Sequence, residues 1–175
     1  MSETVSSRHE IEITKLIETA MSISTDLNFE LQLASRFIEE TDTNVFLTGK
    51  AGTGKTTFLK TLQQQTAKRM IITAPTGVTA INANGVTLHS FFQLPLGPFI
   101  PGTQATEEKR HQQFKLANYK RRIISSLDLL VIDEISMVRA DLLDAVDDVL
   151  RRFRKNSLPF GGVQLLMIGD LHQLP

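Results

Sequence analysis

The sequence contains no cysteine among its 175 residues and no long apolar run. Without cysteine, the chain forms no disulfide bond and no zinc or iron–sulfur site with cysteine ligands. No apolar run approaches the roughly 20 residues that a membrane-spanning helix needs. The acidic, polar N-terminus MSETVSSRHEIEITK also lacks the apolar stretch of a secretory signal. These absences favour a soluble intracellular protein without a membrane partner.

The sequence also lacks an excess of charge of either sign, with 19 basic and 19 acidic side chains. This balance hides an asymmetry, because residues 1–48 carry nine acids and three bases whereas residues 49–175 carry ten acids and sixteen bases. The net charge of +6 on the larger segment permits a polyanionic partner without establishing one. A chain of this length that is 41% apolar buries one substantial core, which predicts one domain.

Helical spacing of apolar residues predicts four helices. The first would break around Ser22–Asn28, and the second would bury Leu31, Ala34, Phe37 and Ile38. The predicted helices cover residues 11–21, 29–40, 55–65 and 142–153.

Four short apolar runs alternate with these helices and predict strands. The later three are continuous rather than alternating, which is typical of central parallel strands covered on both faces. Strands that alternate with helices indicate an α/β fold with a parallel sheet. The predicted strands are Asn44–Thr48, Met70–Ala74, Leu127–Asp133 and Val163–Gly169.

A glycine-rich segment, Gly49–Thr56, fits the pattern G-x-x-x-x-G-K-[ST] at every fixed position. Glycines let backbone N–H groups converge on a β-phosphate, and the following helix directs its positive dipole end at the same place. Lys55 would then reach the β and γ oxygens of ATP, and the Thr56 hydroxyl would bind Mg²⁺. The alternative is a chance match, but a strand before the segment and a helix after it favour a phosphate-binding loop.

Two adjacent acids, Asp133 and Glu134, end an apolar strand. Asp133 would hold Mg²⁺ and Glu134 would orient or deprotonate the attacking water, since both can reach the crevice beyond the strand's carboxyl end. Solvated acids that merely end a strand are the alternative. A water-activating glutamate favours hydrolysis over phosphoryl transfer to a small molecule.

Gln173 follows the last predicted strand, and its amide can both donate and accept hydrogen bonds. It suits a sensor of the γ-phosphate or a residue that positions water. A glutamine in an ordinary exit loop explains the spacing equally well.

Five motifs in order, GKAGTGKTT, APTGVTA, TLHSFF, DLLVIDEISMV and GDLHQLP, resemble the petite-integration-frequency (PIF-type) helicases, which are RecD-related members of helicase superfamily one. The resemblance runs from about Leu27 to Pro175. It implies a P-loop NTPase (RecA-like) fold with a central parallel sheet flanked by helices. It also implies ATP-dependent 5′-to-3′ translocation on single-stranded DNA, with unwinding of duplexes, DNA–RNA hybrids and G-quadruplexes. Single-stranded DNA and DNA junctions or G-quadruplexes are the expected partners.

The resemblance assigns catalysis to Lys55, Thr56, Asp133, Glu134 and Gln173, and Mg²⁺ to Thr56 and Asp133. Gln32 lies near the family's adenine-reading glutamine, although three residues separate it from Asn28, one more than usual. The residues expected to bind ATP are Gln32, Gly49, Ala51, Gly52, Thr53, Gly54, Lys55, Thr56 and Thr57.

The resemblance implies that six residues of APTGVTA and TLHSFF contact DNA. Small hydroxyl side chains and glycine amides in loops can bond phosphates without reading bases, which is consistent with such a role. Phe91 and Phe92 would offer a stacking surface if exposed, or would belong to the core. His89 suits a structural role equally. The expected DNA-binding residues are Thr76, Gly77, Thr87, His89, Ser90 and Phe91.

The predicted domains are a helical or flexible flank at 1–26 and an ATP-binding domain at 27–175. Gln93–Thr106, with three of the six prolines, is expected to be an ordered excursion, and about 93–115 to be a small inserted subdomain. The basic cluster Lys109–Arg122 has six Lys/Arg and no acid, and faces either nucleic acid or solvent.

Because the chain stops at Pro175, we expect the fold to be truncated on its C-terminal side, without the family's second RecA-like domain and its arginine finger. The isolated chain would be a monomer that binds ATP–Mg²⁺ but turns it over poorly. Its place would be the cytoplasm or nucleoid of a bacterium, or the nucleus or mitochondria of a eukaryote. A DNA- or protein-binding module without helicase activity is the alternative, and a small-molecule kinase is disfavoured by TLHSFF.

Overall fold

The computed structural model describes residues 29–50, 52–94, 97–99 and 116–170. The helix predicted at 11–21 lies outside these ranges, as do Ala51, Gln173 and most of the predicted excursion. Within them, Leu94 is buried and Phe99 packs against the core. The ordered excursion as a whole stays a prediction.

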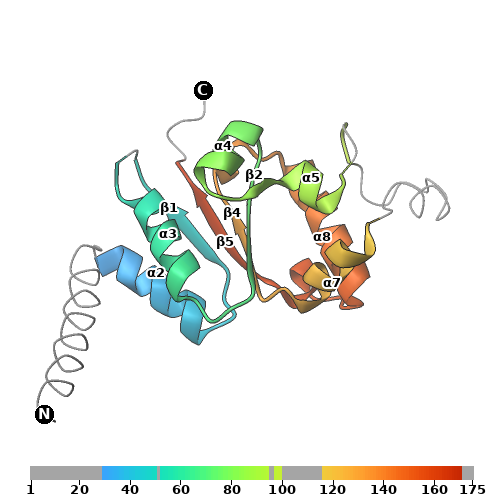
Figure 1. Cartoon of the computed structure of the whole chain (residues 1–175), viewed down its shortest axis with the longest axis horizontal. Coiled ribbons are helices and arrows are strands. Elements are labelled where there is room, and N and C mark those ends of the chain that lie inside the picture. Colours follow the sequence, from blue (N-terminus) through green and yellow to red (C-terminus); the bar gives the residue numbers. More distant parts are fainter. Residues whose placement is uncertain (1–28, 51, 95–96, 100–115, 171–175) are drawn as a thin grey trace, which may run out of the picture.

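Five parallel strands form one sheet in the order β1-β5-β4-β2-β3, which confirms the predicted α/β fold with a parallel sheet (Figure 1). β2 has its predicted bounds, whereas β1, β4 and β5 begin one or two residues later than predicted and β4 also ends one residue earlier, at Ile132. The two-residue β3, paired with the end of β2, was not predicted. The strands are β1 (Val45–Thr48), β2 (Met70–Ala74), β3 (Val86–Thr87), β4 (Leu129–Ile132) and β5 (Gln164–Gly169).

Helices connect the strands, and short 3₁₀ turns precede and follow the longest of them. Two helices have their predicted bounds, at residues 29–40 and 55–65, and the helix predicted at 142–153 extends further at both ends. The helical elements are α2 (Phe29–Glu40), α3 (Lys55–Gln65), α4 (Gly77–Asn82), α5 (Leu88–Phe92), α7 (Asn118–Ser126), η1 (Ile135–Met137), α8 (Ala140–Arg154) and η2 (Pro159–Gly162).

Both faces of the sheet are covered, and each has its own core. Along β4, Leu129 and Val131 join the core formed with α2 and α3, whereas Leu130 and Ile132 join the core formed with α5, α7 and α8. Successive strand side chains point to opposite faces, so a run of four apolar residues serves both cores. Figure 1 shows α2 and α3 on one side of the sheet and α5, α7 and α8 on the other.

The prediction that Phe37 is buried is wrong, because its side chain is 44% exposed. The buried stripe of α2 consists of Leu31, Ala34 and Ile38. Each residue turns an α-helix by about 100°, so Phe37 points away from the stripe that its neighbour Ile38 joins. Apolar character alone did not reveal this difference in direction.

All five strands end at the same edge of the sheet, the upper edge in Figure 1. The loop that follows β1, the helix α4 after β2 and the acids after β4 therefore meet at this edge. Open parallel sheets bind ligands in the crevice beyond these carboxyl ends. In the part of the chain that the structure describes, no helix has the length and apolarity to cross a membrane.

Candidate nucleotide-binding site

The loop between β1 and α3 depends on glycine for its shape. Gly52 and Gly54 have φ angles of 83° and 87°, in the left-handed region that L side chains rarely adopt. A Cβ on Gly49 would lie 2.9 Å from Thr53 Oγ1. Gly54 directly precedes α3, so the loop delivers the backbone to the N-terminus of an eleven-residue helix.

The Lys55 side chain folds back over this loop. Its Nζ donates a hydrogen bond to Gly49 O and another, of 2.9 Å, to Lys50 O. Thr53 Oγ1 also donates to Lys50 O, at 2.9 Å. Backbone carbonyls of the loop thus hold the Lys55 ammonium group at the opening of the glycine-rich turn. Anionic oxygens of a ligand can replace these carbonyls as its hydrogen-bond acceptors.

The chain turns sharply after β4, where the two predicted acids lie. Asp133 N donates to Thr73 O at 2.8 Å and so continues the pairing of β4 with β2. Glu134 then adopts a left-handed conformation, with φ 54° and ψ 45°. This turn directs the chain into η1, so the side chains of Asp133 and Glu134 reach the same cavity instead of opposite faces of the sheet.

Burial raises the pKa of the Asp133 carboxyl above its usual value. A hydrogen bond from the Glu134 backbone N–H and the positive charge of Lys55 act in the opposite direction, but burial is the larger effect. Asp133 is therefore a carboxylate that gains from an additional cation nearby.

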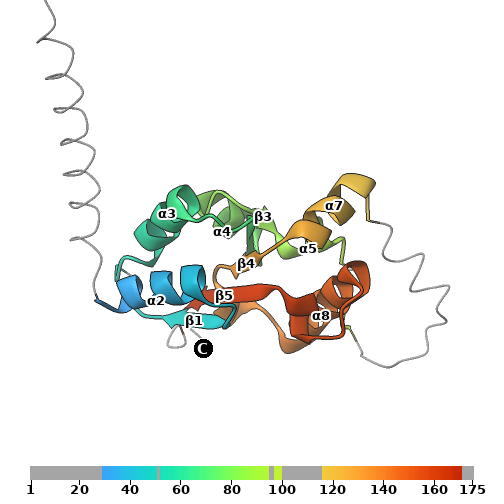
Figure 2. The same ribbon diagram turned by 90° about the horizontal axis from the view of Figure 1, so that it is seen from below.

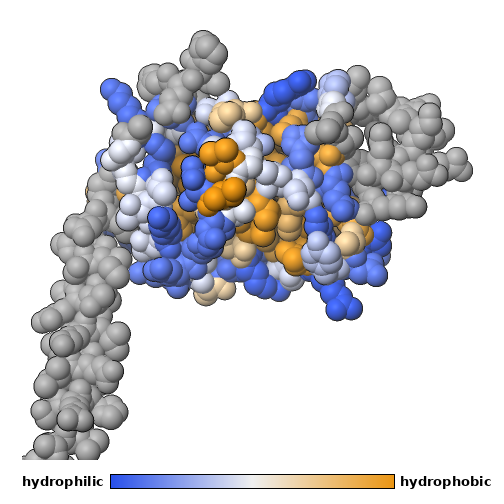
Figure 3. Space-filling view, turned by 45° about the horizontal axis from the view of Figure 1, so that its top comes forward, coloured by the Kyte–Doolittle hydropathy of each residue, from blue (hydrophilic) through white to orange (hydrophobic). Residues whose placement is uncertain are grey.

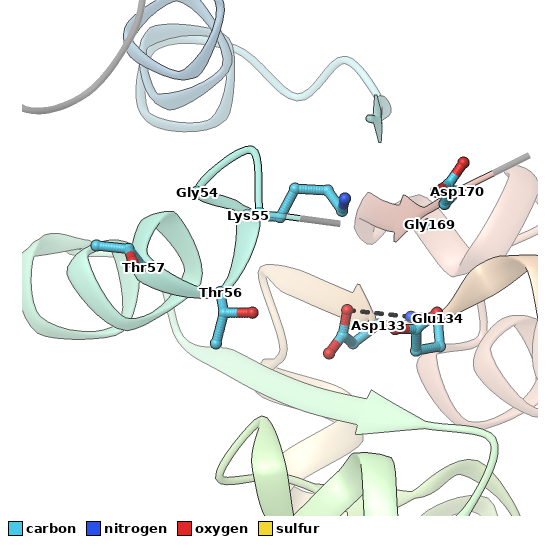
Figure 4. A pocket seen from close by; sticks show the side chains of 9 residues that line it. Gly54, Lys55, Thr56, Thr57, Asp133, Glu134, Gly169 and Asp170 are labelled. Atoms are coloured by element: carbon cyan, nitrogen blue, oxygen red, sulfur yellow. Dashed lines mark hydrogen bonds between the residues drawn. The ribbon is translucent and has the colours of Figure 1, made fainter. Parts of the chain in front are cut away.

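One cavity of about 360 Å³ joins the loop to these acids. Figure 4 shows Lys55 and Thr56 from the loop and the start of α3 facing Asp133, Glu134 and Asp170 across it. Segments almost eighty positions apart in the sequence thus line one space. The lining residues are Gly52, Gly54, Lys55, Thr56, Thr57, Asp133, Glu134, Gly169 and Asp170.

Two short helices, α4 and α5, follow β2 and β3 at the same edge of the sheet as this cavity. Thr76 caps α4 by accepting a hydrogen bond from Thr79 N at 3.2 Å, and Thr87 caps α5 by accepting one from Ser90 N at 3.2 Å. Val78 and Ile81 of α4 are 71% and 79% exposed. Figure 3, with the upper edge turned forward, shows apolar residues at the surface among hydrophilic ones.

The family described as PIF1-like helicase has a sequence model that matches residues 28–175, which is most of the chain. The chain belongs to the PIF1-like helicases.

Relatives and solved structures agree with this membership. The ATP-dependent DNA helicase PIF1 of Saccharomyces cerevisiae is 37% identical over 143 residues, which cover 79% of this chain and 16% of that protein. The crystal structure of Bacteroides sp Pif1 in complex with ADP-AlF4 has a TM-score of 0.77 at 49% identity, covering 85% of this chain and 33% of that one.

Bacteroides Pif1 bound to ssDNA has a TM-score of 0.76 at 50% identity, with coverage of 85% and 33%. The chain therefore spans about a fifth or less of the first curated relatives and about a third of the similar solved chains.

Most of the residues that the family resemblance assigned to ATP, Mg²⁺ and catalysis line this one cavity. Gly49 and Thr53 shape the loop without lining the cavity. Gln32 is exposed on α2 and does not line the cavity either, although the start of α2 is near the loop, because a Cβ on Gly54 would lie 3.4 Å from Leu31 Cδ1. Ala51 and Gln173 lie outside the described residues.

The predicted DNA-binding residues of the PIF1-like motifs lie together at the edge of the sheet, with one correction. Phe91 is 5% exposed and Phe92 is fully buried, and their rings meet edge to face at 4.8 Å between centroids. Phe91 therefore presents no stacking face to a base, and the core alternative holds for both rings. Helical spacing explains this, because Leu88, Phe91 and Phe92 form one buried stripe of α5.

Gly169 and Asp170 line the cavity but were not assigned from the sequence. A Cβ on Gly169 would lie 2.8 Å from Ile135 Cγ2, so glycine lets the end of β5 approach the turn after Glu134 closely. Asp170 is 5% exposed, a third carboxylate in the cavity. Its position directly after the strand was the available signal, since polar residues at the carboxyl ends of neighbouring parallel strands lie close together.

Proposed function

We propose that this chain is the ATP-binding motor region of a 5′-to-3′ DNA helicase, which couples ATP hydrolysis to translocation on single-stranded DNA and to duplex unwinding. The observation that carries the proposal is the single cavity in which Lys55 and Thr56 face Asp133 and Glu134. The Bacteroides Pif1 complexes with ADP-AlF4 and with ssDNA support it through their likeness to this chain.

The cavity residues fit ATP with Mg²⁺. Backbone N–H groups of the glycine-rich turn and the Lys55 ammonium would bind the β- and γ-phosphates. Mg²⁺ prefers oxygen ligands and usually combines one or two carboxylates with phosphates and waters. The Thr56 hydroxyl and the Asp133 carboxylate supply such oxygens, and the ion would neutralise charge that develops on the transferred phosphoryl group.

Glu134 would act on the attacking water. It lies beside Asp133 and its side chain lines the same cavity, so it would orient the attacking water and accept its proton. Gln173 keeps its predicted role as sensor of the γ-phosphate, four residues beyond the end of β5. Gln32 on α2 would read the adenine ring.

DNA would cross the same edge of the sheet. No atom lies within 4 Å of a Cβ added to Gly77, so the surface beside this residue is open, and its N–H would bind a phosphate oxygen. Thr76, Thr87, His89 and Ser90 would add hydrogen bonds to phosphates without reading bases. The partners proposed on this basis are single-stranded DNA, junctions and G-quadruplexes, with a second RecA-like domain closing over the nucleotide and the protein acting as a monomer.

The native protein that carries residues 1–175 tests the function in a strand-displacement assay. The assay compares a duplex with only a 5′ single-stranded tail and a duplex with only a 3′ tail. We expect ATP-dependent displacement of the 5′-tailed duplex alone. Lys55→Ala should abolish displacement, and Lys60→Ala, an exposed lysine further along α3, should not. Displacement without ATP, or equal displacement by Lys55→Ala, would count against a motor and favour a nucleotide-dependent binding module.

A further inference from the structure

Helix α7 carries an unusual surface for so short an element. It contains Lys120, Arg121 and Arg122 and no acidic residue. Tyr119 is 62% exposed and Ile123 is 39% exposed. Residues three and four apart on a helix are neighbours, so Tyr119 lies beside both Arg122 and Ile123 on one outward face.

α7 adjoins α5, one of the helices proposed to meet DNA. Lys120 Nζ donates a hydrogen bond to Ser90 O, which links the first turn of α7 to α5. Figures 1 and 2 both show α5 and α7 in the same part of the molecule. Tyr119 precedes Lys120 directly, so its exposed ring lies at the end of α7 that meets α5.

Contacts with α8 fix the opposite side of α7. Arg154 donates to the carbonyls of Ile124 and Leu127 at 2.9 and 2.8 Å, which satisfies backbone groups at the end of α7. Arg121 lies over the Phe153 ring, 5.5 Å from its centroid. These contacts with α8 fix the position of α7 and therefore of its outward face. The exposed Arg121 adds positive charge next to that face.

We propose that Tyr119 and Arg122 extend the single-stranded DNA path from α5 onto α7. The Tyr119 ring stacks on a base and the Arg122 guanidinium binds a backbone phosphate. The inference rests on the proposed function and adds a contact surface to it. An aromatic ring next to cations matches the two chemical features of single-stranded nucleic acid, a base with a π-face and a charged backbone.

The outward face of α7 differs from the rest of the helix because its cation, Arg122, has no partner among the described residues. Within the described residues, no hydrogen bond or ion pair engages the Arg122 side chain, whereas Lys120, Arg121 and Arg154 already have partners. A surface for a protein partner would be expected to show a larger apolar area, but the exposed face of α7 offers Tyr119 and Ile123 alone as apolar contacts.

Tyr119 is the only tyrosine of the chain, which provides a one-site probe. The 175-residue chain, grown with fluorotyrosine, gives a single fluorine NMR resonance, which is followed while oligo(dT) is added. Fluorescence anisotropy measures the bound fraction in parallel. The resonance should shift in proportion to the bound fraction. An abasic oligonucleotide, which keeps the phosphates and lacks bases, should leave the resonance unshifted when bound.

Substitutions test the two contacts separately. Tyr119→Ala should weaken oligo(dT) binding about tenfold, whereas Tyr119→Phe should bind as the wild type does because the ring is kept. Arg122→Gln should reduce the slope of log affinity against log salt by about 0.7, the value for one phosphate contact on a single strand. The control is Arg36→Gln, because Arg36 is exposed on α2, on the opposite side of the sheet.

A bound oligonucleotide that leaves the resonance and both variants unchanged overturns the α7 contact while the proposed function stands. Equal shifts with oligo(dT) and the abasic strand overturn the stacking role. A wild-type protein that binds ATP but no oligonucleotide at low salt overturns the α7 contact together with the DNA part of the proposed function.

Discussion

The backbone N–H of Glu134 donates a hydrogen bond to Asp133 Oδ1 at 3.0 Å. This bond fixes the Asp133 carboxylate at the point where the left-handed conformation of Glu134 turns the chain out of β4. Because of the turn, adjacent residues that a strand would direct to opposite faces line one cavity. The two proposed roles, Asp133 as a ligand of Mg²⁺ and Glu134 as the base that activates water, depend on this turn.

Asp133→Asn should make the protein more stable at neutral pH while weakening Mg²⁺-dependent ATP binding about tenfold or more. The pKa of Asp133 is raised in the folded state by burial, so its ionised form costs stability. That cost appears as pH rises from the ordinary carboxyl pKa through the raised one, so it grows toward neutral pH. Thermal unfolding and nucleotide titration with Mg²⁺ measure the two effects.

Asp144→Asn is the matched control, because Asp144 is an exposed carboxylate of α8 outside the cavity. It should change neither quantity appreciably. A destabilised Asp133→Asn variant with unaltered Mg²⁺ dependence would contradict the role assigned to Asp133.

Glu134→Gln should bind ATP–Mg²⁺ as the wild type does but hydrolyse it about 10²- to 10⁴-fold more slowly, because an amide cannot accept the proton of water. Single-turnover hydrolysis with the bound fraction held constant separates the two steps. Glu39→Gln, an exposed position on α2, serves as control. Equal loss of binding and hydrolysis in Glu134→Gln would show that this residue holds the nucleotide rather than the water.

The nucleotide loop and much of the sheet could be predicted from the sequence because their determinants are local. Glycines at fixed spacing define the loop, and continuous apolar runs define β2, β4 and β5. Asp133 and Glu134 were recognisable because they directly follow such a run. The spacing of motif residues and the order of neighbouring residues are both visible in the sequence itself.

Other features depend on what a residue meets in three dimensions. Phe37 and Phe91 have the same apolar character, yet Phe37 is exposed on α2 and Phe91 is buried under α5. β3 has only two residues and forms because β2 is beside it, so no run of sequence signals it. Asp170 reaches the cavity only because β5 lies next to β1 and β4.

Gly169→Ala should destabilise the fold by about 1–3 kcal/mol, because the added methyl would lie 2.8 Å from Ile135 Cγ2 and 3.2 Å from Ser136 N. Relief of the contact requires η1 to move, and the turn at Glu134 with it, so Mg²⁺-dependent ATP affinity should fall as well. Gly77→Ala is a control for stability alone, since nothing lies within 4 Å of the added methyl. Equal unfolding midpoints for the two variants would refute the close packing of β5 on η1.

Acid should remove a stabilising contact at the opposite end of the sheet. Arg69 donates to both oxygens of Asp128 at 2.7 Å and, through hydrogen bonding above all, lowers the pKa of Asp128 to about 2 from an ordinary 3.8. A lowered carboxyl pKa gives stability that is present above about pH 4 and is lost as pH falls toward 2.

Asp128→Asn should therefore cost about 1 kcal/mol at pH 7, a value that allows for solvent screening of the partly exposed pair. The difference from the wild type should vanish near pH 2. Urea unfolding at both pH values measures it, and a constant difference would exclude the ion pair as its source.

Calorimetric titration of the chain with a non-hydrolysable ATP analogue, with Mg²⁺ and with EDTA, tests the nucleotide site most directly. We expect saturable one-to-one binding that is tighter with Mg²⁺, is lost in Lys55→Ala and persists in Lys60→Ala. Folded wild-type protein that gives no Mg²⁺-dependent heat, or Lys55→Ala protein that binds as tightly as the wild type, would contradict this expectation.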